Sequence, residues 1–259
     1  MRISGMKSSL ALIAVCCLAA AVIQLSGCSG PLDAEGIMKK SVKALGGIER
    51  ATGWKTSVTR GLMMTNWPGW GKLRADCAYF VQKPDMMVLD QDFSVYDHPF
   101  FFRYTFNAGE AWVMVNLGVR QGARYTEMLE KGLRTVDGIA YYLEHSDTLY
   151  IVTEVEPDSI LSGVDFTRIA AVEGTDTVFF DLDNATLLPV RALDKGDQGE
   201  WNHTVYDDYR PVNGYLVPYH ETTYVNGAIN REMTWKSIEF DVEIDKAEFE
   251  KNRPKPSGD

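Results

Sequence analysis

Short alternating segments, closely spaced along the chain, limit the possible folds most strongly. Apolar and polar residues alternate over residues 55–65, 72–82, 86–93, 100–106 and 111–116, and Gly, Pro, Asn and Asp gather between these runs. Successive side chains of a β-strand point to opposite faces, so each run predicts a strand with one buried face. The separating residues are typical of tight turns, and the runs together predict an antiparallel meander.

Two Asn-Gly pairs extend this pattern into the second half of the chain. Asn213-Gly214 and Asn226-Gly227 each lie between alternating runs, and Asn-Gly is the strongest short-range signal of a two-residue hairpin. Strands resume near residues 149–154, and turn signals recur at Glu173-Gly174 and Asp183-Asn184. These signals predict that the C-terminal half completes one large antiparallel sheet.

Two segments have helical rather than alternating spacing. Asp33 is a typical N-cap residue and Gly46-Gly47 is a typical stop, and apolar residues recur every three or four positions between them. Residues 125–143 show the same spacing and predict a helical insertion. No linker or internal repeat divides the sequence, so we expect one α+β domain over residues 33–259.

The N-terminus has the three parts of a secretory signal peptide. Arg2 and Lys7 precede an apolar run from Leu10 to Ile23, and small residues follow that run. The run is shorter than the ~20 apolar residues that a membrane-spanning helix needs. We therefore expect residues 1–27 to be removed as a signal peptide.

The end of this leader, Leu25-Ser26-Gly27-Cys28, resembles the lipobox of bacterial lipoproteins. The resemblance implies lipid attachment at the Cys28 thiol, with acyl chains such as palmitate holding the protein to a membrane of the cell envelope. The alternative is an ordinary secretory signal in which Cys28 is incidental.

Residues 28–32 then form only a short tether between the lipid and the folded domain. Ser29, where some lipoproteins have aspartate, favours the outer membrane and its periplasmic face in enteric bacteria. A tether of this length favours a local acceptor, holder or sensor of lipid over a freely diffusing carrier.

The charge balance narrows the class of partner. The chain has 26 basic and 36 acidic residues and a formal net charge of −10. This balance argues against nucleic acid as a partner and against a polybasic contact with anionic lipids, so the lipid on Cys28 is the expected membrane attachment. Cys16 and Cys17 lie in the signal peptide, and Cys77 lies in an alternating run where a small buried residue is expected.

The sequence lacks the local motifs of common enzymes. It contains no GxSxG elbow, HExxH helix, P-loop, GxGxxG turn or CxxC pair. We therefore expect no catalytic residue, no metal and no cofactor. The alternative is a site at which His203 and His220 approach each other on neighbouring strands, close to Asp207 and Asp208. Polar residues on a solvated strand face are the simpler interpretation.

Six segments of the chain carry recognisable motifs. They are Asp33 to Gly53 with its Leu-Gly-Gly end, Tyr79 to Asp85 with its basic-Pro-Asp turn, Asn107 to Trp112, Phe180 to Arg191, Tyr206 to Pro218, and Ile244 to Phe249. In this order they resemble motifs of the lipoprotein-sorting superfamily that includes LolA, LolB and the regulator RseB. Each motif alone is a common hairpin, and their order over roughly Asp33 to Glu250 carries the resemblance.

The resemblance implies a strongly curved antiparallel sheet, an unclosed half-barrel, whose concave apolar face is covered by helices. Such a protein holds a lipid or an acylated lipoprotein in an apolar cavity, because an acyl chain is costly to expose to water. The apolar residues predicted to line the cavity are Met87, Leu89, Phe101, Trp112, Met114 and Leu129. Trp112 matches the tryptophan of the family's hairpin, and ordinary core is the alternative for each of the six.

Two further sites follow from the resemblance. In the family's soluble carrier, an arginine before the turn proline holds a lid shut. Lys83 occupies this position and keeps the charge without the planar fork of arginine, so a lid latch of several hydrogen bonds is in question. Trp67 and Trp70, in the preceding turn, are predicted to lie at the cavity mouth and to touch membrane or cargo.

Three functions are open from the sequence. The first is an anchored envelope lipoprotein that binds a lipid or acylated cargo, for lipoprotein sorting or lipid handling. The second is an RseB-like sensor or adaptor that binds an envelope membrane-protein partner. The third is an uncharacterised hydrolase. Fold alone does not decide among them.

Overall fold

The computed structural model describes residues 33–250 except residues 68, 95, 97–99, 117, 157–158 and 197–198. The predicted signal peptide, Cys28 and the tether lie outside the described residues. Within the described part of the chain, no helix is both long enough and apolar enough to cross a membrane.

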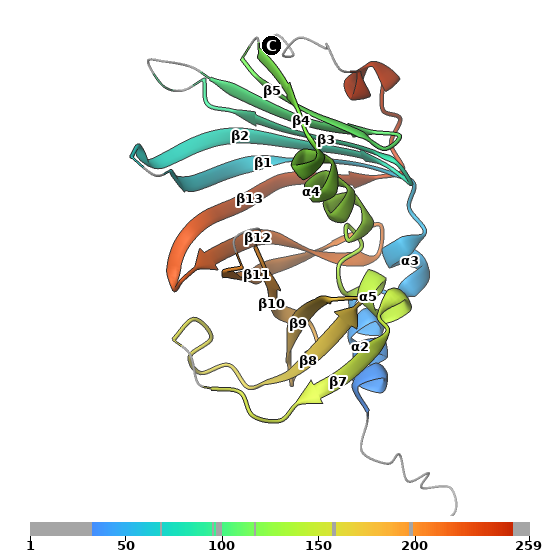
Figure 1. Ribbon diagram of the computed structural model, residues 1–259. Helices are drawn as coiled ribbons and strands as arrows, with labels where there is room; N and C mark the ends of the chain where they lie inside the picture. The colour runs from blue at the N-terminus through green and yellow to red at the C-terminus, as the bar shows by residue number, and fades with distance from the viewer. Residues whose placement is uncertain are drawn as a thin grey trace, which may run out of the picture. The chain divides into compact units, whose positions relative to one another are not determined.

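The described strands form one antiparallel sheet (Figure 1). They are β1 (Thr56–Trp67), β2 (Gly71–Gln82), β3 (Met86–Asp92), β4 (Phe101–Asn107), β5 (Glu110–Val115), β6 (Gly118–Gln121), β7 (Thr148–Val152), β8 (Phe166–Glu173), β9 (Asp176–Asp183), β10 (Pro189–Lys195), β11 (Trp201–Val212), β12 (Tyr215–Val225) and β13 (Ala228–Phe240). β1 pairs with β13, so the two halves of the chain meet at the middle of the sheet. The sheet curves strongly and its edges, β6 and β7, do not pair, which confirms the predicted unclosed half-barrel.

Turn residues determine where the strands reverse. Asn213 and Gly214 have φ angles of 51° and 78°, and Asn226 and Gly227 have φ angles of 51° and 77°. Positive φ at both central residues is typical of the type I′ turn, whose twist matches that of the strands it joins. The turns connect β11 to β12 and β12 to β13, as predicted. The sequence did not predict β6, because its four residues are all exposed and show no apolar alternation.

The described residues form five helical segments where the sequence predicted two. They are α2 (Ala34–Leu45), α3 (Ile48–Thr52), α4 (Ala123–Arg134), α5 (Ile139–His145) and the 3-10 helix η1 (Lys246–Phe249), and α3 and η1 are among those not predicted. The side chain of Asp33 accepts a hydrogen bond from the Gly36 amide at 2.8 Å, so this residue caps α2 as predicted. The single helical insertion is instead two helices, since Gly138 with φ of 57° interrupts it.

Helices cover the concave face of the sheet in two separate groups (Figure 1). In the first group, α2 and α5 pack on β8 to β10, where Met38 and Ile139 lie in one apolar cluster with Phe180. In the second group, α4 packs on β3 to β5, where Leu129 and Leu133 lie in another cluster. The loop of residues 135–138 joins the two groups.

The convex face is also buried in places, and there it holds charged residues. Asp181 is fully buried, and its two carboxylate oxygens accept hydrogen bonds from Arg168 at 2.6 and 2.8 Å and from Arg191 at 2.7 Å. In the other half of the sheet, Arg103 donates to Asp90 at 2.7 and 2.5 Å. Each buried carboxylate is therefore neutralised by a cation on a neighbouring strand.

The pairing of Asp181 with two arginines leads to a stability prediction. Asp181→Asn leaves the buried charges of Arg168 and Arg191 without a counter-ion, and removal of one partner from a buried ion pair costs about 3–5 kcal/mol. We expect urea unfolding to show a loss of that size. Asp208→Asn is the matched control, because the Asp208 pair with Arg210 is exposed and its loss should leave the unfolding midpoint unchanged. Equal midpoints for the two variants would contradict the prediction.

Candidate functional site

A cavity of about 370 Å³ lies on the concave face, where the two groups of helices meet. Strands β1, β2, β9, β11, β12 and β13 line it, together with α3, the end of α2 and the loop of residues 135–138. Its size is within the ~300–1,000 Å³ of small-molecule sites in proteins. The residues around it are Leu45, Ala51, Trp54, Ser57, Thr59, Tyr79, Val81, Thr135, Val136, Asp137, Gly138, Ile139, Phe180, Pro189, Tyr206, Tyr209, Tyr215, Leu216, Val217, Pro218, Glu221, Trp235, Ile238 and Phe240.

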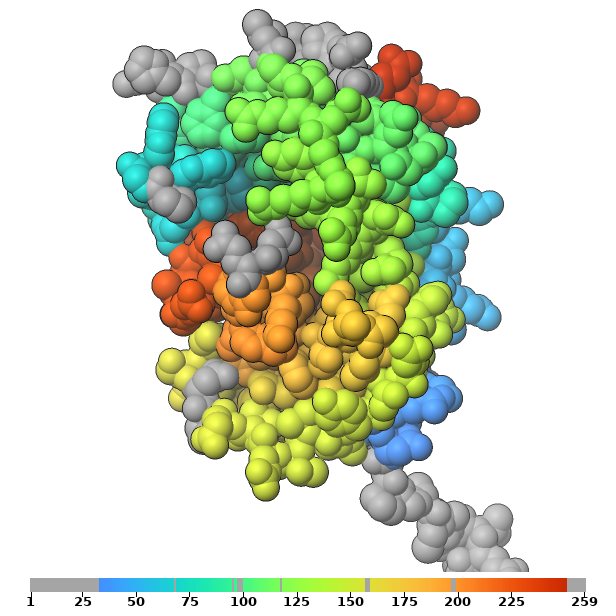
Figure 2. Space-filling model, in the orientation of Figure 1, coloured from blue at the N-terminus to red at the C-terminus, as the bar shows by residue number. Residues whose placement is uncertain are grey.

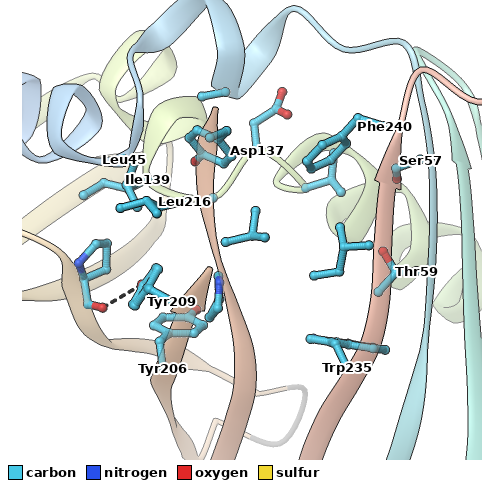
Figure 3. Close-up of a pocket in the computed structure, with 18 of the residues that line it drawn as sticks. Leu45, Ser57, Thr59, Asp137, Ile139, Tyr206, Tyr209, Leu216, Trp235 and Phe240 are labelled. Atoms are coloured by element: carbon cyan, nitrogen blue, oxygen red, sulfur yellow. Dashed lines mark hydrogen bonds between the residues drawn. The ribbon is translucent and has the colours of Figure 1, made fainter. Parts of the chain in front are cut away.

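Opposite walls of the cavity come from different strands (Figure 3). Tyr206, Tyr209 and Leu216 form one wall, and Thr59 and Trp235 form the other. The hydroxyl of Tyr209 donates to the carbonyl of Pro189 at 2.7 Å, as the dashed line shows. The lining is therefore made mostly of aromatic and aliphatic side chains with few polar atoms.

Tyrosines contribute area to the cavity without adding charge. Burial raises the pKa of Tyr206, Tyr209 and Tyr215 well above that of an exposed phenol. All three hydroxyls are therefore neutral at physiological pH. The carboxylates in the lining are Asp137 and Glu221, and Glu221 accepts a hydrogen bond from the Trp235 indole at 2.9 Å.

A close approach of two backbones sets the position of Trp235. Gly61 in β1 pairs with Trp235 in β13, and a Cβ atom at Gly61 would lie 2.8 Å from the indole ring of Trp235. Glycine at this position therefore lets the indole lie flat against β1. A larger residue would push the ring toward the cavity.

Lys83 connects the sheet to the loop over the cavity. Its ammonium group donates to both carboxylate oxygens of Asp137, at 2.6 and 2.7 Å, and to the carbonyl of Thr52 at 3.1 Å. It also lies 3.7 Å from the ring centre of Trp54. Lys83 follows β2, Asp137 lies between α4 and α5, and Trp54 follows α3. One charge thus links the sheet to both groups of helices.

Burial of the Asp137 carboxylate adds a desolvation cost to its contact with Lys83. The pKa of Asp137 is raised above its ordinary value because burial outweighs the hydrogen bond and charge of Lys83. Closing the loop therefore carries a desolvation cost that offsets part of the attraction between the two charges.

Removal of this ammonium group should loosen the loop. In Lys83→Gln, the Asp137 carboxylate loses its counter-ion, and hydrogen bonds to charged groups contribute about 1.5–3 kcal/mol each. We expect the amide of Gly138, which donates to Thr135, to exchange with deuterium at least about tenfold faster than in the wild type.

The control for this experiment is Lys39→Gln, which removes an exposed lysine that pairs with Glu35 on α2. Exchange at Gly138 should be unchanged in this variant. An equal rate at Gly138 in the Lys83 variant and the wild type would show that the ion pair does not hold the loop.

None of the six residues predicted to line the cavity lies in this one. Met87 and Leu129 share the buried cluster under α4, beside the cavity. Leu89 pairs with Tyr79 across β2 and β3 and so lies on the same concave face. Met87 and Leu89 are therefore on the predicted face of the sheet, and Leu129 packs over that face from α4.

The other three predicted residues lie on the convex face. Trp112 pairs with Thr105 and Met114 with Arg103, so both point to the side that carries the Arg103 ion pair. Phe101 is two positions before Arg103 on β4, so its side chain points to the same convex face. The pattern is ambiguous there because both faces of β4 and β5 are buried.

The two tryptophans of the first hairpin lie at the tip where β1 turns into β2. Trp67 stacks on Phe102 with ring centres 5.6 Å apart, and Trp70 meets Phe100 edge-on at 6.0 Å. Trp70 remains 65% exposed. Neither residue lines the cavity, and the strand carries them away from α3 and α5.

Several lining residues were not identified from the sequence. Tyr206, Tyr209, Trp235 and Phe240 lie in motif segments or alternating runs, but these patterns mark strands rather than a cavity wall. Asp208 has a φ of 52° and interrupts the alternation of β11. Tyr206 and Tyr209 therefore both line the cavity, although side chains three positions apart on a regular strand point to opposite faces. This irregularity could have been predicted only from turn-favouring residues within a strand.

Within the described residues, no group of three or more His, Cys, Asp or Glu side chains is placed to hold a metal ion. His220 pairs with Asp207 across β11 and β12, whereas His203 pairs with Tyr224, four positions along β12 from His220. The two histidines therefore do not face each other, whereas the alternative of a metal site between them requires that they do. Cys77 is buried, and burial raises the pKa of its thiol to about 12, so it is protonated.

No protein-family model matches the sequence, and no curated protein sequence matches it. Solved structures do resemble the fold. A DUF1329 family protein from Desulfovibrio piger has a TM-score of 0.53 and 13% identity, with 84% of this chain and 97% of that chain covered. An outer-membrane lipoprotein-sorting protein domain from Vibrio parahaemolyticus has a TM-score of 0.54 and 12% identity, covering 83% and 98%.

A LolA superfamily protein from Nitrosomonas europaea also has a TM-score of 0.54, with 10% identity over 83% of this chain and 97% of that chain. Identities this low support a statement about fold alone. The chain has the LolA-like fold, as the sequence motifs predicted.

Proposed function

We propose that this protein is a membrane-anchored envelope lipoprotein that binds a lipid or an acylated cargo in the cavity of its concave face. The observation that carries the proposal is an apolar cavity under a loop held by a single buried ion pair. The resemblance of the fold to a lipoprotein-sorting domain agrees with this function.

The energetics of an acyl chain suit this site. Transfer of each methylene from water to an apolar environment is worth about 0.8 kcal/mol, so a chain of some ten carbons gains several kcal/mol from burial. The neutral tyrosines on one wall and the flat indole of Trp235 on the other offer such an environment. In this proposal the loop held by Lys83 is the lid, and Lys83 is its latch.

Filling the cavity tests whether it is the binding site. Thr59 lines the cavity from β1, and Thr59→Trp places a bulky ring in the space. We expect lipid extraction and native mass spectrometry to recover an acyl lipid from the wild-type protein and at least about tenfold less from the variant.

The matched control is Thr234→Trp, which adds the same ring on the exposed face of β13. Lipid recovery should equal that of the wild type. If Thr59→Trp folds and carries as much lipid as the control, the cavity is not where lipid binds.

Anchoring at Cys28 is a separate part of the proposal. The lipobox-like segment that ends at Cys28 offers lipid as the attachment. In bacteria fed a palmitate analogue that carries a chemical tag, we expect the wild-type chain to be labelled and to sediment with membranes. Cys28→Ala should be unlabelled, whereas Cys77→Ala should label like the wild type, because Cys77 is buried. Labelling of the Cys28 variant would contradict the proposal.

The anchor determines how cargo reaches the site. Attachment next to Asp33 keeps the domain at the membrane surface, where a lipid or acylated lipoprotein is available without crossing water. Trp67 and Trp70 at the exposed hairpin tip are the proposed contacts with that membrane or with cargo, because tryptophan is suited to the interface between lipid and water. Ser29 supports the outer membrane as the location.

A further inference from the structure

Arg231 is an arginine on the same concave face as the cavity. It lies in β13, four residues from Trp235, and pairs with Thr223 of β12 on one side and Thr65 of β1 on the other. Residues at even spacing along a strand point to one face, so the side chain of Arg231 follows those of Trp235 and Met233. The spacing of four residues corresponds to ~13 Å along the strand.

The position of Arg231 is toward the open end of the half-barrel. β13 starts at Ala228, after the turn at Asn226-Gly227, and runs toward Phe240, beside α3 and α5 (Figure 1). Figure 3 shows Trp235 at the opposite end of the cavity from Asp137, which pairs with Lys83. Figure 2 shows the molecular surface hollowed between α4 and the orange strands β11 to β13. Arg231 itself lies outside the lining of the cavity, so a ligand has to extend past Trp235 to reach it.

The guanidinium group of Arg231 is poorly satisfied by the protein. Among the described residues, no carboxylate lies within 4.0 Å of it. Its Nε atom is buried without a hydrogen-bond partner, and its Nη2 atom reaches only the hydroxyl of Thr223, at 3.5 Å. A partly buried cation without a counter-ion is costly, and its buried N–H donor adds to that cost. An anion that met this group would remove both costs.

Two carboxylates face the same region and restrict which anion fits. Glu221 of β12 is engaged by the Trp235 indole, and Asp194 of β10 is half-buried and interacts with the charges of Lys131 and Arg231. Because these carboxylates face the region of Arg231, a ligand with several negative charges would be repelled. One negative charge per ligand matches the charge of Arg231, which has no carboxylate of the described residues within 4.0 Å.

We propose that Arg231 binds the anionic group of a singly charged amphiphile whose acyl chain occupies the cavity. This inference rests on the proposed function and specifies its ligand as a monoanionic lipid, either a phosphodiester headgroup or a fatty-acid carboxylate. Arginine suits both, since its planar fork donates two parallel hydrogen bonds to a phosphate or a carboxylate. The chain enters past Trp235 and the head stays near the β12–β13 turn.

The test compares amphiphiles that share a sixteen-carbon chain and differ in charge. The probes are palmitoyl lysophosphatidylglycerol, hexadecanoate and hexadecanol, each below its micelle-forming concentration. Affinity is measured on the full chain by the change in fluorescence of its tryptophans, since Trp54 and Trp235 line the cavity. We expect the wild type to bind at least one of the two anions about tenfold or more tightly than the neutral alcohol. The tighter of the two anions identifies phosphodiester or carboxylate as the preferred headgroup.

Variants then assign the discrimination to one residue. Arg231→Gln should bind hexadecanol as the wild type does and lose the preference for the anions, and Arg231→Lys should keep part of the preference because it keeps the charge. Arg120→Gln, on the exposed strand β6, is the control and should behave as the wild type. Retained hexadecanol binding shows that a variant has folded.

Each outcome separates this inference from the function on which it rests. Equal binding of alcohol and anions by the wild type, or a preference that survives Arg231→Gln, overturns the assignment of Arg231 and leaves the lipid cavity intact. Failure of all three probes to bind overturns both. Stronger binding of a lipid with two phosphates, tested alongside, would overturn the restriction to one charge.

Discussion

The apolar concave face of an open, curved sheet is the constraint on which the rest of this structure depends. A closed barrel fills its interior with its own side chains, whereas an open one needs other elements to keep water from its concave face. Here α2 and α5 cover one part and α4 covers another. The loop of residues 135–138 spans the interval, and Val136 is its one large apolar residue. The cavity exists because that loop covers the space without filling it.

The loop of residues 135–138 is contacted by a compact cation, the ammonium group of Lys83. An arginine fork requires partners in one plane, but an ammonium group donates in several directions, so Lys83 meets Asp137, the carbonyl of Thr52 and the ring of Trp54 together. The replacement of arginine by lysine at residue 83 therefore changes the geometry of the hydrogen bonds rather than the number of contacts. Burial of the Asp137 carboxylate reduces the net free energy gained from its ion pair with Lys83, which suits the proposed opening of the lid.

Strands and turns could be predicted from the sequence, whereas the cavity wall could not. Asn-Gly turns and the Asp33 cap are local signals, and the structure confirms them. The wall depends on which face of each strand is concave, and alternation identifies a face only where the other is solvated. In β5 both faces are buried, so Trp112 and Met114 looked equivalent to their neighbours and lie on the convex side. Buried ion pairs on that side, such as Arg103 with Asp90, link charged residues on strands of separate hairpins.

The two unpaired edges of the sheet affect how copies of the protein behave when they are crowded together. An open sheet exposes a row of backbone donors and acceptors at each edge, and these can pair with the edge of another molecule. Here the edge strands are the shortest described, with four residues in β6 and five in β7. Short edges offer another chain few hydrogen bonds, so the half-barrel can remain open without growing into larger sheets when many copies of the protein come together.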